Sequence, residues 1–272
     1  MSSFRAACVQ LTAGREDEVT LVTACDLIRQ AHAGGADYVQ TPECTTMMEP
    51  NKHLTLKKAL PESEHPSVKA FSALAAELGI WLHIGSLIVG TEEKRAANRA
   101  FLFDPKGEVK ARYDKIHMFD VEIPDGQSYR ESATFKPGEK AVVTALPWTQ
   151  LGMAICYDVR FPYLFRAQAK QGAGILTAPA AFTKFTGEAH WHTLLKARAI
   201  ENGCFVIAAG QCGVHAEGRE TYGHSLIIAP WGEVLADGGS EPGVIFADID
   251  LERVQQARDM VPSIDHDREF SF

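Results

Sequence analysis

Short apolar runs of strand length recur along the chain, and in its first part they alternate with segments of helical periodicity. Further along, the runs follow one another more closely, separated by turn residues such as Pro230-Trp231-Gly232. This order predicts sheets covered by helices, in an α/β or layered α+β fold. Strands are expected at residues 4–11, 37–40, 80–89, 98–103, 108–112, 141–146, 151–155, 174–178, 204–209, 223–229, 234–237 and 244–248, and helices at residues 16–33, 66–78, 161–171, 189–202 and 251–259. Residues 47–61 and the long polar segment 113–138 are expected to be irregular.

Composition narrows the class of protein. The chain of 272 residues has 46% hydrophobic and 23% charged residues, which is typical of a globular protein with a substantial core. No repeat, low-complexity segment or linker-like change in composition divides it, so we expect a single domain over residues 1–272. A net charge of −8 and the lack of runs rich in Lys and Arg argue against a nucleic-acid partner or an anionic membrane surface.

The expected cellular location follows from two kinds of segment, membrane-spanning and secretory, that the sequence does not show. No apolar segment approaches the length needed to cross a bilayer, and the first residues, MSSFRAACVQL, have no apolar core of a secretory signal. We therefore expect a cytoplasmic protein whose six cysteines stay reduced. The cysteines show no CxxC pairing, which argues against a zinc site or a redox motif.

One stretch, LGMAICYDVRFPY at residues 151–163, combines a buried strand with polar residues at its exit. Cys156 stands where the apolar run ends, just before a turn and a helix. A cysteine held there is well placed for nucleophilic attack, because the strand fixes it and the turn exposes backbone N–H groups that can stabilise an oxyanion. On its own, however, a cysteine in an apolar run is far more often a structural core thiol.

Three charged residues elsewhere have the chemistry that a nucleophilic thiol needs. Glu43 follows the second strand, Lys115 begins the long polar segment, and Glu131 lies later in that segment. A carboxylate can act as the base that deprotonates the thiol, and a fixed cation can stabilise the tetrahedral oxyanion. A second carboxylate can hold the lysine in place. On position alone, all three are expected to be solvated surface charges.

Sequence blocks spread over nearly the whole chain favour the catalytic interpretation. They are TPE (residues 41–43), YDKIHMFD (113–120), RESATFKPG (130–138), ICYDVRFP (155–162), KARAIENG (196–203) and YGHSLIIAPWGEVL (222–235). In their types and their order, these blocks resemble the nitrilase, or carbon–nitrogen hydrolase, superfamily. The stretches FDVEIPDG (119–126), QCGVHAEGRETYGHS (211–225) and HDREF (266–270) look like its amidase branch acting on deaminated glutathione, and the related omega-amidases match them less well.

The resemblance implies a role for each matching residue. Cys156 is the nucleophile, Glu43 the general base, Lys115 the oxyanion cation, and Glu131 the auxiliary carboxylate. The backbone N–H of Tyr157 is implied as a second oxyanion donor. The implied fold is a four-layer α-β-β-α sandwich that pairs into a homodimer or a larger homo-oligomer. No metal and no organic cofactor are implied.

The implied reaction is hydrolysis of a primary carboxamide on a small carboxylate-bearing substrate, giving acid and ammonia through a thioester on Cys156. Deaminated glutathione amidase is the favoured activity. The alternatives are an omega-amidase acting on 2-oxoglutaramate or 2-oxosuccinamate, a nitrilase, and a non-catalytic scaffold of the same fold. The intact set of four catalytic residue types argues against the scaffold.

Several further residues are candidates for binding. Arg160 could hold a substrate carboxylate bidentately, although an ion pair with Asp158 is an equally good interpretation. Phe182 and Thr183 follow a strand end and could line the pocket. A metal site at His190-Trp191-His192 is not expected, because residues i and i+2 of a helix point to different faces and no carboxylate partner is apparent. His117 and His224 are expected to be structural.

Overall fold

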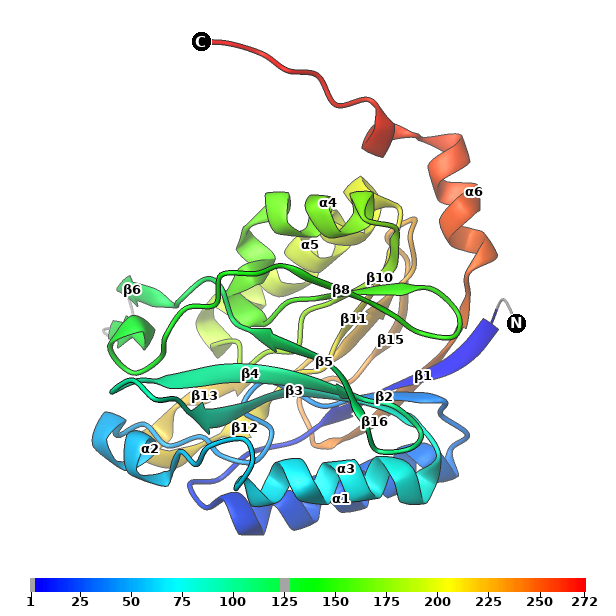
Figure 1. The fold of residues 1–272 in the computed structure, drawn as a ribbon. Helices are drawn as coiled ribbons and strands as arrows, with labels where there is room; N and C mark the ends of the chain where they lie inside the picture. The colour runs from blue at the N-terminus through cyan, green and yellow to red at the C-terminus, as the bar shows by residue number, and fades with distance from the viewer. Residues whose placement is uncertain (1–2, 123–127) are drawn as a thin grey trace.

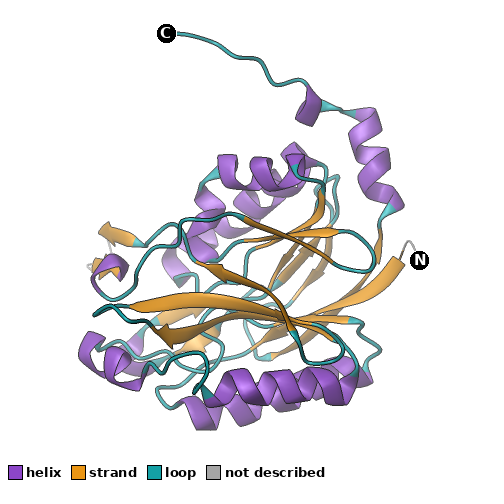
Figure 2. Ribbon diagram, in the orientation of Figure 1, coloured by secondary structure: helices purple, strands orange, loops and turns teal. Residues whose placement is uncertain are grey.

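Two six-stranded sheets face each other between two layers of helices, as the computed structural model shows for residues 3–122 and 128–272 (Figure 1). Figure 2 shows the succession of helix, strand, strand and helix layers across the molecule. The four-layer α-β-β-α sandwich expected from the sequence is confirmed. Apolar side chains of both sheets join in one buried cluster, which includes Tyr38 from the first sheet and Leu151 and Ile175 from the second.

The first sheet has the strand order β16-β1-β2-β3-β4-β5. Its strands are β1 (Ser3–Gln10), β2 (Tyr38–Gln40), β3 (Trp81–Gly90), β4 (Ala96–Phe103), β5 (Val109–Asp114) and β16 (Gly243–Asp250). Strands β1, β2 and β3 run parallel, and the outer pairs are antiparallel. Helices α1 (Asp17–Ala33) and α3 (Pro66–Leu78) cover its outer face (Figure 1).

The second sheet has the order β15-β14-β11-β10-β9-β8, again with a parallel centre formed by β9, β10 and β11. Its strands are β8 (Val142–Ala145), β9 (Gln150–Met153), β10 (Ala173–Thr177), β11 (Phe205–Ala208), β14 (Leu226–Ile228) and β15 (Val234–Asp237). Helices α4 (Pro162–Lys170) and α5 (Lys184–Asn202) cover it, and α5 ends at Gly203, whose φ of 57° allows the expected stop.

Several expectations about local structure were wrong. The segment 47–61 contains a helix, α2 (Lys52–Lys58), which Asn51 caps by accepting hydrogen bonds from the N–H groups of His53 and Leu54. It was missed because seven residues are too few to show a period. The described part of the segment 113–138 contains strands β6 (Asp120–Glu122) and β7 (Ser128–Arg130) and the 3₁₀ turn η1 (Glu131–Ala133).

Other elements add detail near the ends of the sheets. A missed hairpin pairs β12 (Cys212–Val214) with β13 (Glu220–Tyr222) across the 3₁₀ turn η3 (Ala216–Gly218). Helix α5 begins at Lys184, earlier than the expected residue 189. After α6 (Glu252–Met260) and η4 (Ser263–Asp265), the chain extends away from the sheets (Figure 1).

Two further sequence expectations concern the residues that the structure describes. The block FDVEIPDG, at residues 119–126, lies partly outside the described residues. Within residues 3–122 and 128–272, none of the helices combines the length and the apolar character needed to cross a membrane.

Candidate active site

The candidate catalytic residues meet where strands of the two sheets end. Glu43 follows β2, Lys115 follows β5 directly, and Cys156 stands three residues beyond β9. Together with Glu131, they line a cavity of about 510 Å³, a size suited to a small molecule. Three of them are almost completely buried, with exposed fractions of 4% for Glu43, 2% for Lys115 and 7% for Cys156. Position alone favoured solvated charges for Glu43 and Lys115, but the fold buries both of them.

Lys115 is clamped between two carboxylates. Its Nζ donates to Glu43 Oε1 at 2.8 Å and to both carboxylate oxygens of Glu131 at 2.9 Å. Burial alone would lower the pKa of Lys115, but the two carboxylates raise it well above its ordinary value. The lysine therefore stays charged inside the protein, at the floor of the cavity.

Asn98 completes this network, although no pattern in the sequence points to it. It lies on β4, and its Nδ2 donates to Glu43 Oε1 at 2.9 Å and to Glu131 Oε1 at 3.3 Å. The remaining oxygen of Glu43, Oε2, accepts the backbone N–H of Ala181 at 2.8 Å. Both oxygens of the Glu43 carboxylate are thus fixed by donors from separate elements.

Cys156 adopts a strained backbone conformation. Its φ is +49°, a left-handed value that is uncommon for a residue with a side chain and that often marks functional sites. Its backbone N–H donates to Pro179 O at 2.9 Å, at the loop that follows β10. This bond ties the sharp turn between β9 and the 3₁₀ turn η2 (Cys156–Arg160) to the neighbouring strand.

The thiol is protonated in the resting site. Burial raises the pKa of Cys156 well above its ordinary value, and the negative charge of Glu43 raises it further, although Lys115 acts in the opposite direction. Burial also raises the pKa of Glu43, but Lys115 and the hydrogen bonds from Cys156 and Ala181 outweigh it and lower that pKa overall. The resting pair is therefore a carboxylate that accepts a hydrogen bond from a neutral thiol.

Tyr157 is the second residue of η2 and lines the cavity. Backbone N–H groups in the first turn of a helical segment have no partner within that segment. The Tyr157 N–H therefore has no partner within η2, and Tyr157 directly follows Cys156 in the chain.

Asp158 holds the turn that presents Cys156. Its Oδ2 accepts the hydroxyl of Tyr113 at 2.7 Å and the N–H of Ile155 at 2.8 Å, and its Oδ1 contacts His117 Nδ1 at 2.6 Å. Asp158 has an exposed fraction of 0%. It links the cysteine turn to the segment that carries Lys115, and it gives His117 the expected structural place.

Of the expected binding residues, Phe182 and Thr183 line the cavity and Arg160 does not. The guanidinium of Arg160 lies 5.3 Å from the centre of the Phe182 ring and contacts His190 Nδ1 at 3.3 Å. The alternative interpretation, an ion pair with Asp158, was wrong, because the carboxylate of Asp158 is engaged by Tyr113 and His117.

The cavity is instead lined by three other cations, Lys52, Arg130 and Arg219, which the sequence did not single out. Arg130 is paired with Glu122 at 2.9 Å. Arg219 lies with its guanidinium 5.4 Å from the centre of the Tyr129 ring and donates from Nη2 to Ala181 O at 3.0 Å. Its Nε is buried and has no hydrogen-bond partner among the described residues, which is rare for a buried donor.

The neighbouring thiol of Cys44 also lines the cavity. Burial, with the charge of Glu43 as a further cause, raises the pKa of Cys44 to about 12. It therefore stays neutral, as expected for a core thiol.

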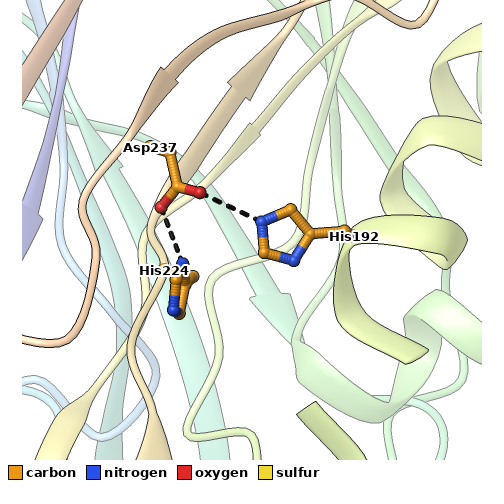
Figure 3. A group of neighbouring side chains, drawn as sticks. All are labelled: His192, His224 and Asp237. Atoms are coloured by element: carbon orange, nitrogen blue, oxygen red, sulfur yellow. Dashed lines mark hydrogen bonds and ion pairs between the residues drawn. The ribbon is translucent and has the colours of Figure 1, made fainter. Parts of the chain in front are cut away.

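The histidines on α5 diverge as expected, but one of them has partners that the sequence did not show. His190 faces Arg160, whereas His192 meets His224 and Asp237 from other elements (Figure 3). Asp237, at the end of β15, is therefore the carboxylate partner of His192 that was not apparent from the sequence.

The fold and this site define the class of protein. A family model for carbon–nitrogen hydrolases matches residues 5–259, and the chain belongs to that family. Its relatives include proteins named for amidase activity, and this chain is accordingly a hydrolase of carbon–nitrogen bonds.

Individual relatives cover nearly the whole chain. It is 42% identical over 270 residues to the deaminated glutathione amidase of Synechocystis sp., with 98% of each chain covered. It is 36% identical to omega-amidase NIT2 of Xenopus tropicalis, covering 96% of this chain and 94% of that protein.

Solved structures share the fold. Saccharomyces cerevisiae Nit3, a member of branch 10 of the nitrilase superfamily, has a TM-score of 0.87 and 28% identity, covering 96% of this chain and 95% of that one. An amidase variant from Nesterenkonia sp. AN1, with acrylamide added at its active-site cysteine, has a TM-score of 0.80 and 29% identity, covering 95% and 98%.

Proposed function

We propose that the protein hydrolyses a small, carboxylate-bearing amide by two-step covalent catalysis on Cys156. The observation that carries the proposal is the buried contact of Lys115 with Glu43 beside a protonated thiol at the floor of a cavity. A neutral thiol next to a carboxylate is a nucleophile with its base already in place. The amidase names of the relatives support the same chemistry.

In the first step, Glu43 accepts the thiol proton while the sulfur of Cys156 attacks the amide carbonyl. Lys115 and the Tyr157 N–H donate to the oxyanion that forms. An ammonium group has three N–H donors, and one N–H directed between the two oxygens of Glu131 can serve both contacts of Lys115 to that carboxylate. One donor then remains for the oxyanion.

The tetrahedral intermediate collapses when Glu43 returns its proton to the departing nitrogen. The carbon–nitrogen bond breaks, the amine or ammonia leaves, and a thioester remains on Cys156. Glu43 then takes a proton from a water molecule that attacks the thioester. Collapse of the second intermediate releases the acid and reprotonates the sulfur, so one carboxylate serves as base and acid in both halves.

The two activities named among the relatives differ in the leaving group. Glutathione contains only peptide amides, so cleavage of deaminated glutathione releases an amine, and the primary carboxamide and ammonia expected from the sequence do not apply to this substrate. A primary carboxamide, such as that of 2-oxoglutaramate, releases ammonia instead. Both substrates carry carboxylates, which fits the cations on the cavity wall. We propose deaminated glutathione as the preferred substrate, because its amidases give the highest identity among the relatives compared here.

A substrate panel tests this proposal. Initial rates would be measured on deaminated glutathione, 2-oxoglutaramate, butyramide and butyronitrile, with the acid product and the released amine or ammonia quantified together. We expect the two carboxylate-bearing amides to exceed butyramide in kcat/KM, with deaminated glutathione first, and Cys156→Ala to be inactive on all four. Preference for butyramide would contradict the proposed substrate class, and faster turnover of the nitrile than of its amide would revive the nitrilase alternative.

We propose Arg219 as the residue that binds a substrate carboxylate. Arg219 lines the cavity and has no carboxylate partner among the described residues, and a hydrogen bond to a charged group contributes about 1.5–3 kcal/mol. Arg219→Met should therefore raise KM for the carboxylate-bearing amides by about 10- to 100-fold and leave butyramide turnover unchanged.

The matched control for Arg219 is Arg130→Met, which removes a guanidinium that is already paired with Glu122 at the same cavity. It should change KM little. An equal loss on charged and uncharged amides in Arg219→Met would instead assign Arg219 to support of the Ala181 loop.

Two further expectations stay predictions. Six free cysteines suit a reducing compartment, and cell fractionation would test the cytoplasmic location. Light scattering on the purified protein would test the expected homodimer or larger assembly, and a monomer at micromolar concentration would contradict it.

A further inference from the structure

Three side chains from separate elements converge on a surface away from the catalytic cavity. His192 lies on α5, His224 precedes β14, and Asp237 ends β15 (Figure 3). None of the three lines the cavity that holds Cys156. They are partly exposed, with side-chain fractions of 32%, 27% and 36%.

The carboxylate lies between the two imidazoles. His192 Nε2 is 3.0 Å from Asp237 Oδ2, and His224 Nδ1 is 2.8 Å from Asp237 Oδ1. The three potential ligand atoms all lie within 4.8 Å of one another. Donors bound to one tetrahedral zinc ion stand about 3.3 Å apart. The two short contacts are made to different oxygens of Asp237, so one oxygen already lies close to one imidazole nitrogen, and the other imidazole would have to approach from within 4.8 Å.

The backbone around His224 is held in an unusual conformation. Its φ is +49°, and its N–H donates to Gly239 O while its carbonyl accepts Trp191 Nε1 at 2.8 Å. The ring is stacked on Tyr222, with centres 4.4 Å apart. Asp237 Oδ1 also accepts the Gly239 N–H at 2.9 Å. Two of the three ligands are therefore oriented by surrounding contacts, as metal ligands commonly are.

We propose that His192, His224 and Asp237 form a binding site for a divalent transition metal ion, with zinc as the best match. Two imidazole nitrogens and one carboxylate oxygen are ligands that zinc takes in proteins, and three protein ligands leave a fourth position for water. Each imidazole would bind through the nitrogen that now faces Asp237, and its proton would reside on the other ring nitrogen.

The ion would join α5 to β14 and β15. Helix α5 begins one residue after Thr183, and Tyr222 N–H donates to Phe182 O at 3.0 Å on the cavity wall. Binding would therefore stabilise that wall, while the amide chemistry at Cys156 would not pass through the ion. The expected effect is on thermal stability and not on the chemical step.

Metal binding is best measured in Cys156→Ala, because a reactive thiol could capture zinc itself. Calorimetric titration with zinc should give one equivalent bound and a higher Tm. Cobalt(II) should give visible d–d bands without the thiolate charge-transfer band that a cysteine ligand adds. A thiolate band would assign the metal to a cysteine and overturn the proposal.

Three ligand variants, each in that background, identify the site. His192→Gln, Asp237→Asn and His224→Asn should each weaken zinc binding at least about tenfold and abolish the rise in Tm. Asparagine suits the left-handed backbone at residue 224, so that variant tests ligation and not strain.

The matched control is His32→Gln, which removes an exposed histidine at the end of α1 and should leave zinc binding unchanged. Circular dichroism before metal addition establishes that each variant is folded. Failure of the parent to bind one equivalent, or affinity that none of the three ligand variants lowers, would show that the cluster is only a hydrogen-bond network.

Discussion

Lys115 makes hydrogen bonds to Glu43 and Glu131, and its ammonium is almost completely enclosed. Removing one member of such a buried set leaves the others without compensation, at a cost of about 3–5 kcal/mol. Lys115→Met should lower the free energy of unfolding by about that amount and abolish turnover, because two carboxylates would remain together without a cation. Urea unfolding and product release measure the two effects.

The control for this prediction is Lys136→Met, which removes an ammonium from an exposed ion pair with Glu93. Exposed pairs contribute little, so its unfolding curve should match that of the parent. Equal unfolding curves for the Lys115 and Lys136 variants would contradict the buried charge network.

The pH dependence of activity and stability follows from the shifted pKa values of Glu43 and Cys156. The pKa of Glu43 lies below its ordinary 4.5, and that of the Cys156 thiol lies above its ordinary 9.0. The reactive pair of carboxylate and thiol thus exists throughout the range between them, where kcat/KM should be level. The same shift in Glu43 stabilises the fold above its ordinary pKa, and this contribution is lost as the pH falls through the lowered pKa.

A pH–rate profile with circular dichroism at each point separates activity from unfolding. Activity should decline only at acid pH, below 4.5. A rise in kcat/KM toward alkaline pH with a midpoint near that of a free thiol, about 8.5, would mean that a preformed thiolate is the nucleophile.

At the scale of elements, two loops bring the carboxylate and the thiol together, and Gly85 on β3 lies between them. A Cβ added there would stand 2.2 Å from Thr41 O, in the loop that leads to Glu43. It would also stand 2.5 Å from Pro179 Cβ, in the residue whose carbonyl accepts the Cys156 N–H. The register of β3 against β4 shifts between Ile84 and Leu87, which places this glycine at an irregularity in the sheet.

Gly85→Ala should therefore destabilise the protein by about 1–3 kcal/mol and reduce kcat, because the added methyl group pushes both loops. Gly243→Ala is the matched control on β16, since nothing lies within 4 Å of its added Cβ. Thermal unfolding and initial rates on one substrate would be compared for both. Normal kcat in Gly85→Ala would show that the site tolerates displacement of these loops.

At the scale of the whole molecule, the sequence predicted the layers better than the details. Apolar runs such as residues 151–155 and capped helices such as α3 have periods long enough to recognise, and these elements lie where expected. The sequence patterns of the short helix α2 and of the hairpin formed by β12 and β13 are too brief for either element to be recognised from the sequence.

The site could be predicted only through resemblance. Single charged residues such as Glu43 and Lys115 look like surface residues until the fold buries them. Asn98 and Arg219 reach the cavity from a strand and a hairpin that no local pattern connects to Cys156. Arg160 follows Cys156 closely in the sequence, but it stacks against Phe182 and is not among the described residues that line the cavity, since the side-chain direction of a turn residue cannot be inferred from sequence separation.

The central claim is that Cys156 carries the acyl group during turnover. Acid quenching within milliseconds of mixing with deaminated glutathione, followed by intact-mass measurement and peptide mapping, tests it directly. The proposed mechanism predicts a mass increase equal to the acyl fragment, located on the peptide that contains Cys156 and absent from Cys156→Ala. Multiple turnovers by the parent with no adduct at any quench time, together with residual hydrolysis by Cys156→Ala, would contradict it.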